Sequence, residues 1–216
     1  MDLVAENLTY KPQDEFHLDD VSFTMKRGQL YTILGRTLAG KTTLLKAIAG
    51  LLTVDGGSIK VGGQDFGNIP VWERNIAMVY QQFINYPHLT VFNNVAFPLR
   101  QRKLDEATIS QRVMSSLQTV GLEGFEARKI QALSGGQQQR VAVARAMASK
   151  PDIILADEPT ANLDSKTGAE LLDLMRELNA EQGLTFLFST HDQMIMARAQ
   201  RLVHIKDGVV EQDEVR

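Results

Sequence analysis

Cysteine and long apolar segments are both missing from this sequence of 216 residues, which contains 0 Cys. Without cysteine the chain cannot form disulfides, thiolate zinc sites or a cysteine nucleophile. Its apolar tracts are broken by lysine or glycine and fall well short of the roughly 20 residues that a membrane helix needs. The first residues, MDLVAENLTY, lack the basic region and apolar stretch of a secretory signal. We therefore expect a cytoplasmic location.

Neither sign of charge is in large excess, because 23 basic and 26 acidic residues leave a formal net charge of −3. Such a chain has no overall positive field to attract nucleic acid, and we expect no nucleic-acid partner. The hydrophobic share of 44% lies in the ordinary globular range, outside the composition of disordered chains. There is no internal repeat, low-complexity tract or flexible linker. The sequence therefore predicts a single domain over residues 1–216.

The apolar residues form two kinds of pattern that alternate along the chain. Short apolar runs predict strands at 3–10, 21–25, 30–34, 153–156 and 184–188. Apolar residues at helical spacing predict helices at 41–50, 102–120, 137–148 and 165–181. Near the end, Asp207-Gly208 predicts the turn of a hairpin. Strands that alternate with helices favour an α/β fold with a mostly parallel sheet.

One glycine-rich loop carries a strong signal for phosphate. Residues 35–42 read GRTLAGKT, a GxxxxGK[ST] match between a predicted strand and a predicted helix. Backbone N–H groups there carry partial positive charge, Lys41 adds a cation for the β- and γ-phosphates, and the Thr42 hydroxyl can ligate Mg²⁺. We predict that a nucleoside triphosphate contacts Gly35, Arg36, Thr37, Leu38, Ala39, Gly40, Lys41, Thr42 and Thr43.

Further short motifs stand at the ends of other predicted elements. LSGGQ opens the helix at 137–148, ADEP ends the strand at 153–156, and STHD follows the strand at 184–188. In this order, and over nearly the whole chain, they resemble the motifs of ABC (ATP-binding cassette) ATPases. That family's fold is a phosphate-loop NTPase with a mostly parallel sheet, an N-terminal antiparallel β portion and a helical subdomain. The resemblance places the core at about 1–82 and 150–216 and the helical subdomain at about 83–149.

The resemblance also implies roles for single residues. ATP and Mg²⁺ are the expected cofactors, with Mg²⁺ bound by Thr42, Gln81 and Asp157. Glu158 is the expected general base, assisted by Lys41, Gln81 and the γ-phosphate contact His191. Tyr10 is expected to stack on adenine. The signature residues that would contact the nucleotide of a second protomer are Ser134, Gly135, Gly136 and Gln137.

Those signature contacts imply a head-to-tail homodimer or heterodimer, with Asp164 at the dimer interface. The resemblance further implies membrane-spanning partner subunits and a place on the cytoplasmic face of the inner membrane. The predicted function is ATP hydrolysis that powers a membrane transporter. Its alternatives are a soluble ABC-type ATPase of DNA repair or translation and a regulatory cassette that does not hydrolyse ATP. A guanine-specific NKxD motif is missing, which disfavours a GTPase.

Several assignments stay open at this point. Gln82 competes with Gln81, and Phe16 competes with Tyr10. Asp164 also suits a helix N-cap, because a side-chain oxygen there can accept from the first turn. The N-terminal half resembles the ATPases of carbohydrate or polyol importers, whereas the C-terminal half resembles those of lipoprotein release or macrolide export.

Overall fold

The computed structural model describes residues 2–190, 193–196 and 199–215. The chain divides into two compact units. The sheet unit comprises Met1–Met78, Asp152–Glu158 and Arg176–Arg216, and the helical unit comprises Val79–Pro151 and Pro159–Met175. The division runs through one strand and one helix, β6 and α5, which therefore contribute residues to both units.

The smaller sheet of the sheet unit is antiparallel. Its order is β2-β1-β4-β5, and its strands are β1 (Leu3–Tyr10), β2 (Leu18–Met25), β4 (Gly56–Val61) and β5 (Gln64–Asp65). A short 3₁₀ turn, Pro12–Asp14, joins β1 to β2. Alternate residues such as Leu3 and Ala5 are buried while the opposite face is more exposed, as expected for a sheet with one covered face. The predicted N-terminal antiparallel portion is confirmed.

The larger sheet is mostly parallel, as the alternating pattern predicts. Its order is β10-β9-β3-β8-β7-β6, with β3 pairing in parallel with both β8 and β9, and β7 with β8. The strands are β3 (Leu30–Leu34), β6 (Ile76–Val79), β7 (Ile153–Asp157), β8 (Thr185–Thr190), β9 (Arg201–Lys206) and β10 (Val209–Val215). Every residue of β3, β7 and β8 is buried, which explains their continuous apolar runs. The predicted hairpin is β9–β10, antiparallel across Asp207-Gly208.

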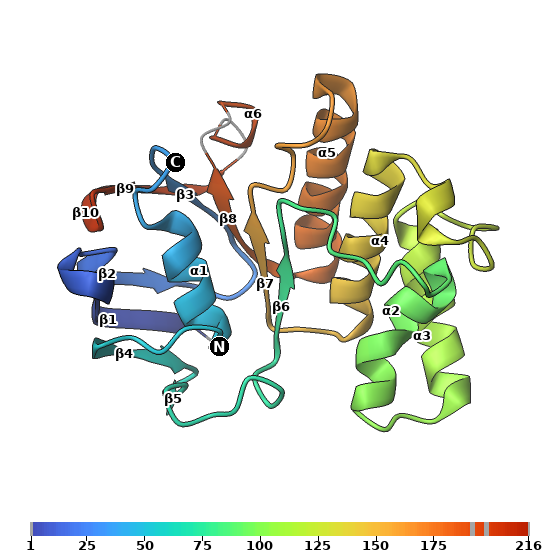
Figure 1. The fold of residues 1–216 in the computed structure, drawn as a ribbon, viewed down its shortest axis with the longest axis horizontal. Coiled ribbons are helices and arrows are strands. Elements are labelled where there is room, and N and C mark those ends of the chain that lie inside the picture. Colours follow the sequence, from blue (N-terminus) through green and yellow to red (C-terminus); the bar gives the residue numbers. More distant parts are fainter. Residues whose placement is uncertain (1, 191–192, 197–198, 216) are drawn as a thin grey trace. The chain divides into compact units, whose positions relative to one another are not determined.

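Helix α1 (Lys41–Ala49) lies between the two sheets of the sheet unit (Figure 1). Its buried residues Leu44, Leu45 and Ile48 share one core with strand residues of both sheets. Gly50 ends the helix in the left-handed conformation, with φ of 77°, which a residue with a side chain rarely adopts. The four-residue α6 (Gln193–Met196) lies between β8 and β9 in the chain. Burial on both sides fixes α1, and with it the loop from which it starts.

The helical unit is built on three helices and the first part of a fourth (Figure 1). These are α2 (Val91–Gln101), α3 (Glu106–Thr119), α4 (Gly135–Ala148) and α5 (Ser165–Gln182), with a 3₁₀ turn at Ile130–Ala132. The helix predicted from Arg102 starts only at Glu106, because the Asp105 carboxylate caps the first turn by accepting from Thr108 N–H. Helix α2 has no counterpart among the predicted helices, and Pro98 lies inside it.

Within the described residues, no helix is both long enough and apolar enough to cross a membrane.

Candidate functional site

The predicted phosphate loop leaves the larger sheet at an edge where three strands end together. Leu34 at the end of β3 pairs with Thr190 at the end of β8, and Asp157 at the end of β7 pairs with Ser189. The carboxyl ends of neighbouring parallel strands meet at one edge, where ligands of α/β sheets bind. The sheet order thus brings residues that are more than 100 positions apart in sequence to the start of α1.

The first turn of α1 has no capping side chain. Gly40 is its N-cap, makes no side-chain hydrogen bond, and is followed by no acidic residue in the first turn. By contrast, α2, α3, α4 and α5 are capped by Thr90, Asp105, Ser134 and Asp164. The N–H groups that open α1 are therefore left for another acceptor, which is the property of a helix end that binds phosphate.

The loop before α1 is held by backbone contacts. Gly40 has φ of 99°, and a Cβ at this position would lie 2.3 Å from the carbonyl oxygen of His17, so only glycine fits there. Gly208 N–H, from the β9–β10 turn, donates to the Ala39 oxygen at 3.2 Å. Leu38 is 97% exposed with φ of 69°, a conformation that costs a residue with a Cβ about 1–2 kcal/mol. Leu38 is thus an exposed, left-handed residue within the phosphate loop.

Lys41 is buried beneath this loop. Its ammonium donates to the carbonyl oxygens of Gly35 at 2.7 Å and Arg36 at 3.0 Å, and lies 3.7 Å from a Glu158 carboxylate oxygen. A buried cation needs such acceptors, because an unpaired charge is expensive away from water. The contacts place a positive charge next to the uncapped helix end, where the resemblance assigns Lys41 its role.

Thr42 and Asp157 form a small cluster of oxygen atoms. The Thr42 hydroxyl lies 3.0 Å from each oxygen of the Asp157 carboxylate, and the Ser189 hydroxyl donates to the same carboxylate. Hard oxygen donors of this kind suit Mg²⁺, which usually takes one or two carboxylates together with substrate phosphates and water. The described residues contain no cluster of three or more His, Cys, Asp or Glu side chains that could hold a metal alone. Thr42 and Asp157 therefore fit a magnesium ion that arrives with a nucleotide.

Glu158 stands where the chain turns out of β7. Its φ is 44°, its N–H donates to the Ser189 oxygen at 2.9 Å, and its carboxylate accepts from the Thr190 hydroxyl at 3.1 Å. A left-handed glutamate is strained by about 1–3 kcal/mol, and such strain clusters at functional sites. The two adjacent acids have different hydroxyl partners, Ser189 for Asp157 and Thr190 for Glu158.

Ser189 and Thr190 are site residues that the sequence reasoning did not assign. Each hydroxyl contacts one of the two acids that end β7, Ser189 with Asp157 and Thr190 with Glu158. The signal for them was the STHD sequence, in which two hydroxyl residues end a strand. His191, the predicted γ-phosphate contact in the same motif, lies outside the described residues.

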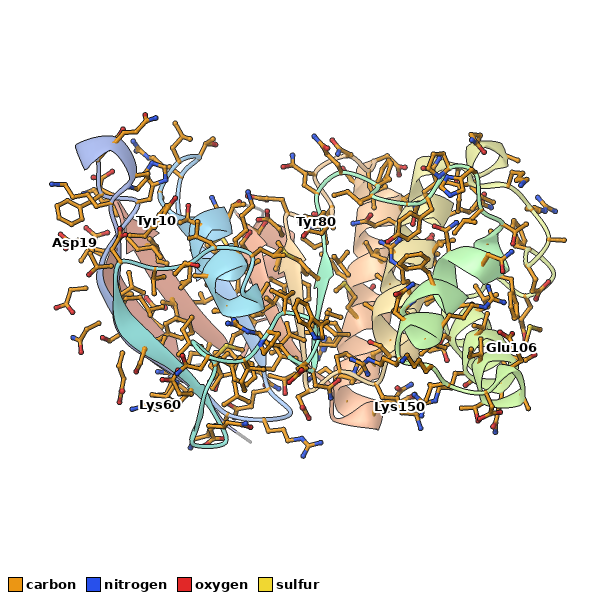
Figure 2. All side chains as sticks on the ribbon, turned by 60° about the horizontal axis from the view of Figure 1, so that its bottom comes forward. Tyr10, Asp19, Lys60, Tyr80, Glu106 and Lys150 are labelled. Atoms are coloured by element: carbon orange, nitrogen blue, oxygen red, sulfur yellow. The ribbon has the colours of Figure 1, made fainter. Side chains whose placement is uncertain are left out.

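The aromatic candidates for adenine lie at the far end of β1 in the sheet unit. Figure 2 labels Tyr10 there, beside the start of β2. Tyr10 is partly buried against the core and meets His17 edge-on, with ring centroids 6.0 Å apart. Phe16 is 45% exposed, with the Lys11 ammonium 5.0 Å above its ring. The assignment of adenine to Tyr10 stays a prediction.

Gln81 belongs to the helical unit, where its main chain is held by the segment that follows Glu158. The Asn162 side chain donates to the Gln81 carbonyl oxygen at 2.9 Å. Both Gln81 and its competitor Gln82 are exposed. The assignment of the magnesium contact to Gln81 rather than Gln82 therefore stays a prediction.

The signature residues form a capped helix start. The Ser134 hydroxyl accepts from Gln137 N–H at 3.3 Å, and the Gln137 side chain accepts from Ser134 N–H at 3.0 Å, which is a complete capping box. A serine hydroxyl that accepts one bond can still donate its own proton. Ser134 thus serves as a cap and keeps a donor for a phosphate.

Asp164 likewise caps α5. Its carboxylate accepts from Thr167 N–H at 3.0 Å and from the Thr167 hydroxyl at 2.7 Å. These hydrogen bonds hold the pKa of Asp164 below its ordinary value. The N-cap suggested by the sequence is present, and the place of Asp164 at a dimer interface stays a prediction.

An uncapped glycine-loop helix, a buried lysine and two acids at the end of a parallel strand define a nucleotide-binding protein of the phosphate-loop class. Residues 18–161 match the family model described as ABC transporter, and the chain belongs to this family. The family assignment made from the sequence motifs is thus confirmed.

Two curated relatives carry the name spermidine/putrescine import ATP-binding protein PotA. The relative from Fusobacterium nucleatum is 44% identical over 176 residues, which are 82% of this chain and 47% of that protein. The relative from Vibrio vulnificus is 42% identical over 197 residues, which are 91% of this chain and 52% of that protein. The chain thus spans about half the length of the curated relatives it matches.

Solved structures of this fold cover almost the whole chain. The ATP-binding cassette MJ0796, in a dimeric post-hydrolysis state bound to ADP and Pi, is 34% identical with a TM-score of 0.88, covering 99% of this chain and 98% of that chain. The protein cbiO1 of Clostridium perfringens, part of the ABC transporter complex cbiONQ, is 28% identical with a TM-score of 0.89, covering 99% and 88%. The fold predicted from the sequence is that of an ATP-binding cassette.

Proposed function

We propose that this chain binds ATP with Mg²⁺ and hydrolyses it as the ATP-binding subunit of a membrane transporter. One observation carries the proposal. The sheet unit gathers an uncapped helix start, the Lys41 ammonium, the Thr42–Asp157 oxygen pair and the Glu158 carboxylate at the end of neighbouring strands. An anion site, a cation, a metal site and a base are the parts that phosphoryl transfer from a nucleotide requires.

Lys41 and the backbone of residues 35–43 bind and orient the phosphates. In the described structure the ammonium is held by two loop carbonyls and faces Glu158. A triphosphate offers stronger acceptors than neutral carbonyls, so Lys41 exchanges these partners for phosphate oxygens when the nucleotide binds. This exchange also moves the Lys41 ammonium away from the Glu158 carboxylate, which it faces at 3.7 Å.

Glu158 then serves as the general base. Its carboxylate orients the attacking water and accepts a proton from it, while the Thr190 hydroxyl, 3.1 Å away, fixes the direction of the side chain. Because the strained backbone and the Ser189 carbonyl also hold this residue, the base is positioned before the substrate arrives. His191 is proposed to contact the γ-phosphate.

Thr42 and Asp157 would hold Mg²⁺, with Gln81 as the third proposed ligand. Magnesium bound there supplies positive charge that neutralises the phosphate oxygens. Ser189 keeps the Asp157 carboxylate oriented by donating its hydroxyl proton. Hydrogen-bonded second partners of this kind fix the direction of a ligating carboxylate.

A second nucleotide-binding domain completes the site. We propose that Ser134, Gly135, Gly136 and Gln137 of one copy contact the nucleotide of the other, with Asp164 at the interface. The dimeric MJ0796 cassette bound to ADP and Pi supports this arrangement. Closure on ATP and opening after hydrolysis would then drive the transporter.

The membrane partners supply the path for the cargo. The curated relatives named as spermidine/putrescine import proteins and the cbiONQ complex support a transporter role. We therefore place the chain on the cytoplasmic face of the inner membrane, attached through those partners. The names of the two curated relatives favour import as the direction of transport.

The test measures MgATP turnover against protein concentration for the wild type and for Glu158→Gln. We expect turnover to rise more steeply than concentration, and Glu158→Gln to lose about 10²- to 10⁴-fold of kcat, the usual share of a general base. The variant should still bind ATP and elute as a dimer with ATP in sizing chromatography. Glu106→Gln is the matched control, because the exposed Glu106 carboxylate at the start of α3 pairs with Arg100 near the end of α2, in the helical unit.

The contrary outcomes are distinct. Near-normal turnover of Glu158→Gln removes this residue from the role of base. A wild-type chain that binds ATP and dimerises without turnover identifies a regulatory cassette instead of an ATPase.

A further inference from the structure

Gln139 is the last of three consecutive glutamines in α4, and it is 0% exposed. Its Nε2 donates to two main-chain oxygens, that of Tyr80 at 3.1 Å and that of Pro159 at 3.0 Å. All three residues belong to the helical unit, and Figure 2 labels Tyr80 just after the end of β6. One buried carboxamide thus joins two main-chain segments that are nearly 80 residues apart in sequence.

Both segments lead directly to proposed site residues. Tyr80 immediately precedes Gln81, and Pro159 immediately follows Glu158. Since a peptide unit is planar and rigid, a fixed carbonyl group also restricts the residue on the other side of its peptide bond. The held Tyr80 carbonyl therefore restricts Gln81, the proposed magnesium ligand. The Pro159 carbonyl belongs to the peptide unit that joins Pro159 to Thr160, so Gln139 holds the chain one residue beyond the proposed base.

The two ends of the Gln139 carboxamide differ in their pairing. The Gln139 Oε1 atom is buried without a hydrogen-bond partner among the described residues. An apolar side chain of similar volume would avoid this buried, unpaired acceptor, but it would leave the Tyr80 and Pro159 oxygens without the Nε2 donor. The two contacts of Nε2 are what such a substitution would remove.

The segment around Gln81 has further supports from the same unit. Asn162 donates to the Gln81 oxygen at 2.9 Å, and the Arg145 guanidinium of α4 donates to the Ile84 oxygen at 2.5 Å. Asn162 lies in the segment that begins at Pro159. The Gln139 side chain thus holds the carbonyl of residue 80, and the Asn162 side chain holds the carbonyl of residue 81. Of these two side chains, Gln139 also holds the carbonyl of Pro159.

We propose that Gln139 is a positioning residue of the ATPase site, which keeps the segment that carries Gln81 in register with the segment that follows Glu158. The inference rests on the proposed function for its effect on turnover. It concerns main-chain geometry within the helical unit, and this geometry can be measured without turnover.

The experiment compares Gln139→Met with the wild type and with a matched control. Methionine keeps the volume and removes both donor contacts. The control is Asn179→Leu, because Asn179 is also a buried amide that donates to two main-chain oxygens, those of Gly28 at 2.9 Å and Leu184 at 2.7 Å. Thermal stability, kcat and KM for MgATP, and amide hydrogen exchange of the nucleotide-free protein are measured for all three.

We expect Gln139→Met to lower kcat by about tenfold or more and to change KM by less than about threefold, because positioning affects the reacting state more than binding. Within the helical unit, exchange should accelerate in the segments 80–86 and 160–164 and in no other segment. Asn179→Leu should lose comparable thermal stability while kcat stays at the wild-type value. That pattern separates positioning from a general loss of stability.

Wild-type kcat in a folded Gln139→Met protein would overturn the inference, and so would unchanged exchange in both segments. If Gln139→Met does not fold, Gln139→Asn replaces it with the same expectation, since the shorter amide cannot reach both oxygens. Failure of both variants to fold beside a folded control would reduce Gln139 to a structural role. A wild-type protein without turnover would refute the proposed function, and the exchange measurement would still decide the positioning.

Discussion

Gly136 of the signature gives the sharpest prediction about packing. A Cβ built at this position would lie 2.3 Å from Cγ2 of Thr167, more than 1 Å closer than an ordinary carbon contact of 3.4–4 Å. Gly136 is not among the described residues with positive φ, so alanine is compatible with its backbone. The Gly136→Ala substitution therefore tests the approach of α4 to α5 alone.

The magnitude follows from two opposing terms. Alanine gains about 0.5–1 kcal/mol over glycine within a helix, because less backbone freedom is lost on folding. Overpacking costs about 1–3 kcal/mol when a neighbour must move. The middle of these two ranges gives a net destabilisation of about 1 kcal/mol, which lowers Tm by about 2–4 °C in a chain of this size.

Thermal unfolding of four proteins tests this reasoning. They are the wild type, Gly136→Ala, Thr167→Ser and the double variant, because serine removes Cγ2 and keeps the hydroxyl that binds Asp164. The free energy of unfolding of the double variant should match that of Thr167→Ser to within about 0.5 kcal/mol, since the two sites are in direct contact and serine removes the overlap. Gly135→Ala is the control, because its Cβ would come no closer than 3.1 Å to the Phe83 ring and 3.9 Å to Leu163 Cδ2, a much smaller overlap than at Gly136.

Two results would refute the packing argument: Gly136→Ala as stable as the wild type, or a double variant no better than Gly136→Ala. Turnover of a recovered double variant then reports on chemistry. If it stays low at restored stability, a glycine at position 136 is also needed where a phosphate would approach.

Two further predictions concern polar contacts. Arg74→Met should lower the free energy of unfolding by about 2–4 kcal/mol in denaturant titrations. The buried Arg74 guanidinium donates to the main-chain oxygens of Phe66 at 2.5 Å and Ile48 at 3.2 Å, and the substitution would leave both oxygens unpaired. Stability equal to the wild type would contradict this. Asp164→Ala should be less stable than the wild type at pH 7, and the difference should shrink as the pH falls below about 4. Hydrogen bonds from Thr167 lower the pKa of Asp164 in the folded state. The stability that the ionised carboxylate contributes is therefore lost when acid protonates it. Unfolding curves at a series of pH values check the sign, and a gap that widens toward acid would refute it.

The sequence predicts the phosphate loop and the main sheet because their signals are local or continuous. GRTLAGKT carries its spacing within eight residues, and strands buried on both faces appear as unbroken apolar runs. Helix α2 was missed for the opposite reason. Pro98 interrupts its pattern, and the run QQFINYPHLTVFNN contains aromatic and turn residues that do not follow one period.

The site contacts were harder to predict because identical residues have different surroundings. Gln137 closes the capping box, Gln138 donates to the Leu133 oxygen, and Gln139 is buried between two other segments. Successive helix residues point about 100° apart, so three consecutive glutamines have three different environments. Ser189 and Thr190 are a similar case, since their partners become neighbours only through the parallel pairing of β7 with β8.

The two glycine-containing helix starts of this chain differ in the donors that they leave for phosphate. At α1 no side chain caps the first turn, so its N–H groups and Lys41 are available to a nucleotide without the loss of an existing cap. At α4 the Ser134–Gln137 capping box already satisfies two N–H groups, those of Ser134 and Gln137. Because the proposed signature contact adds fewer free donors, we expect it to bind phosphate only after α1 has placed the nucleotide. We therefore predict that this chain binds ATP before it associates with a second copy.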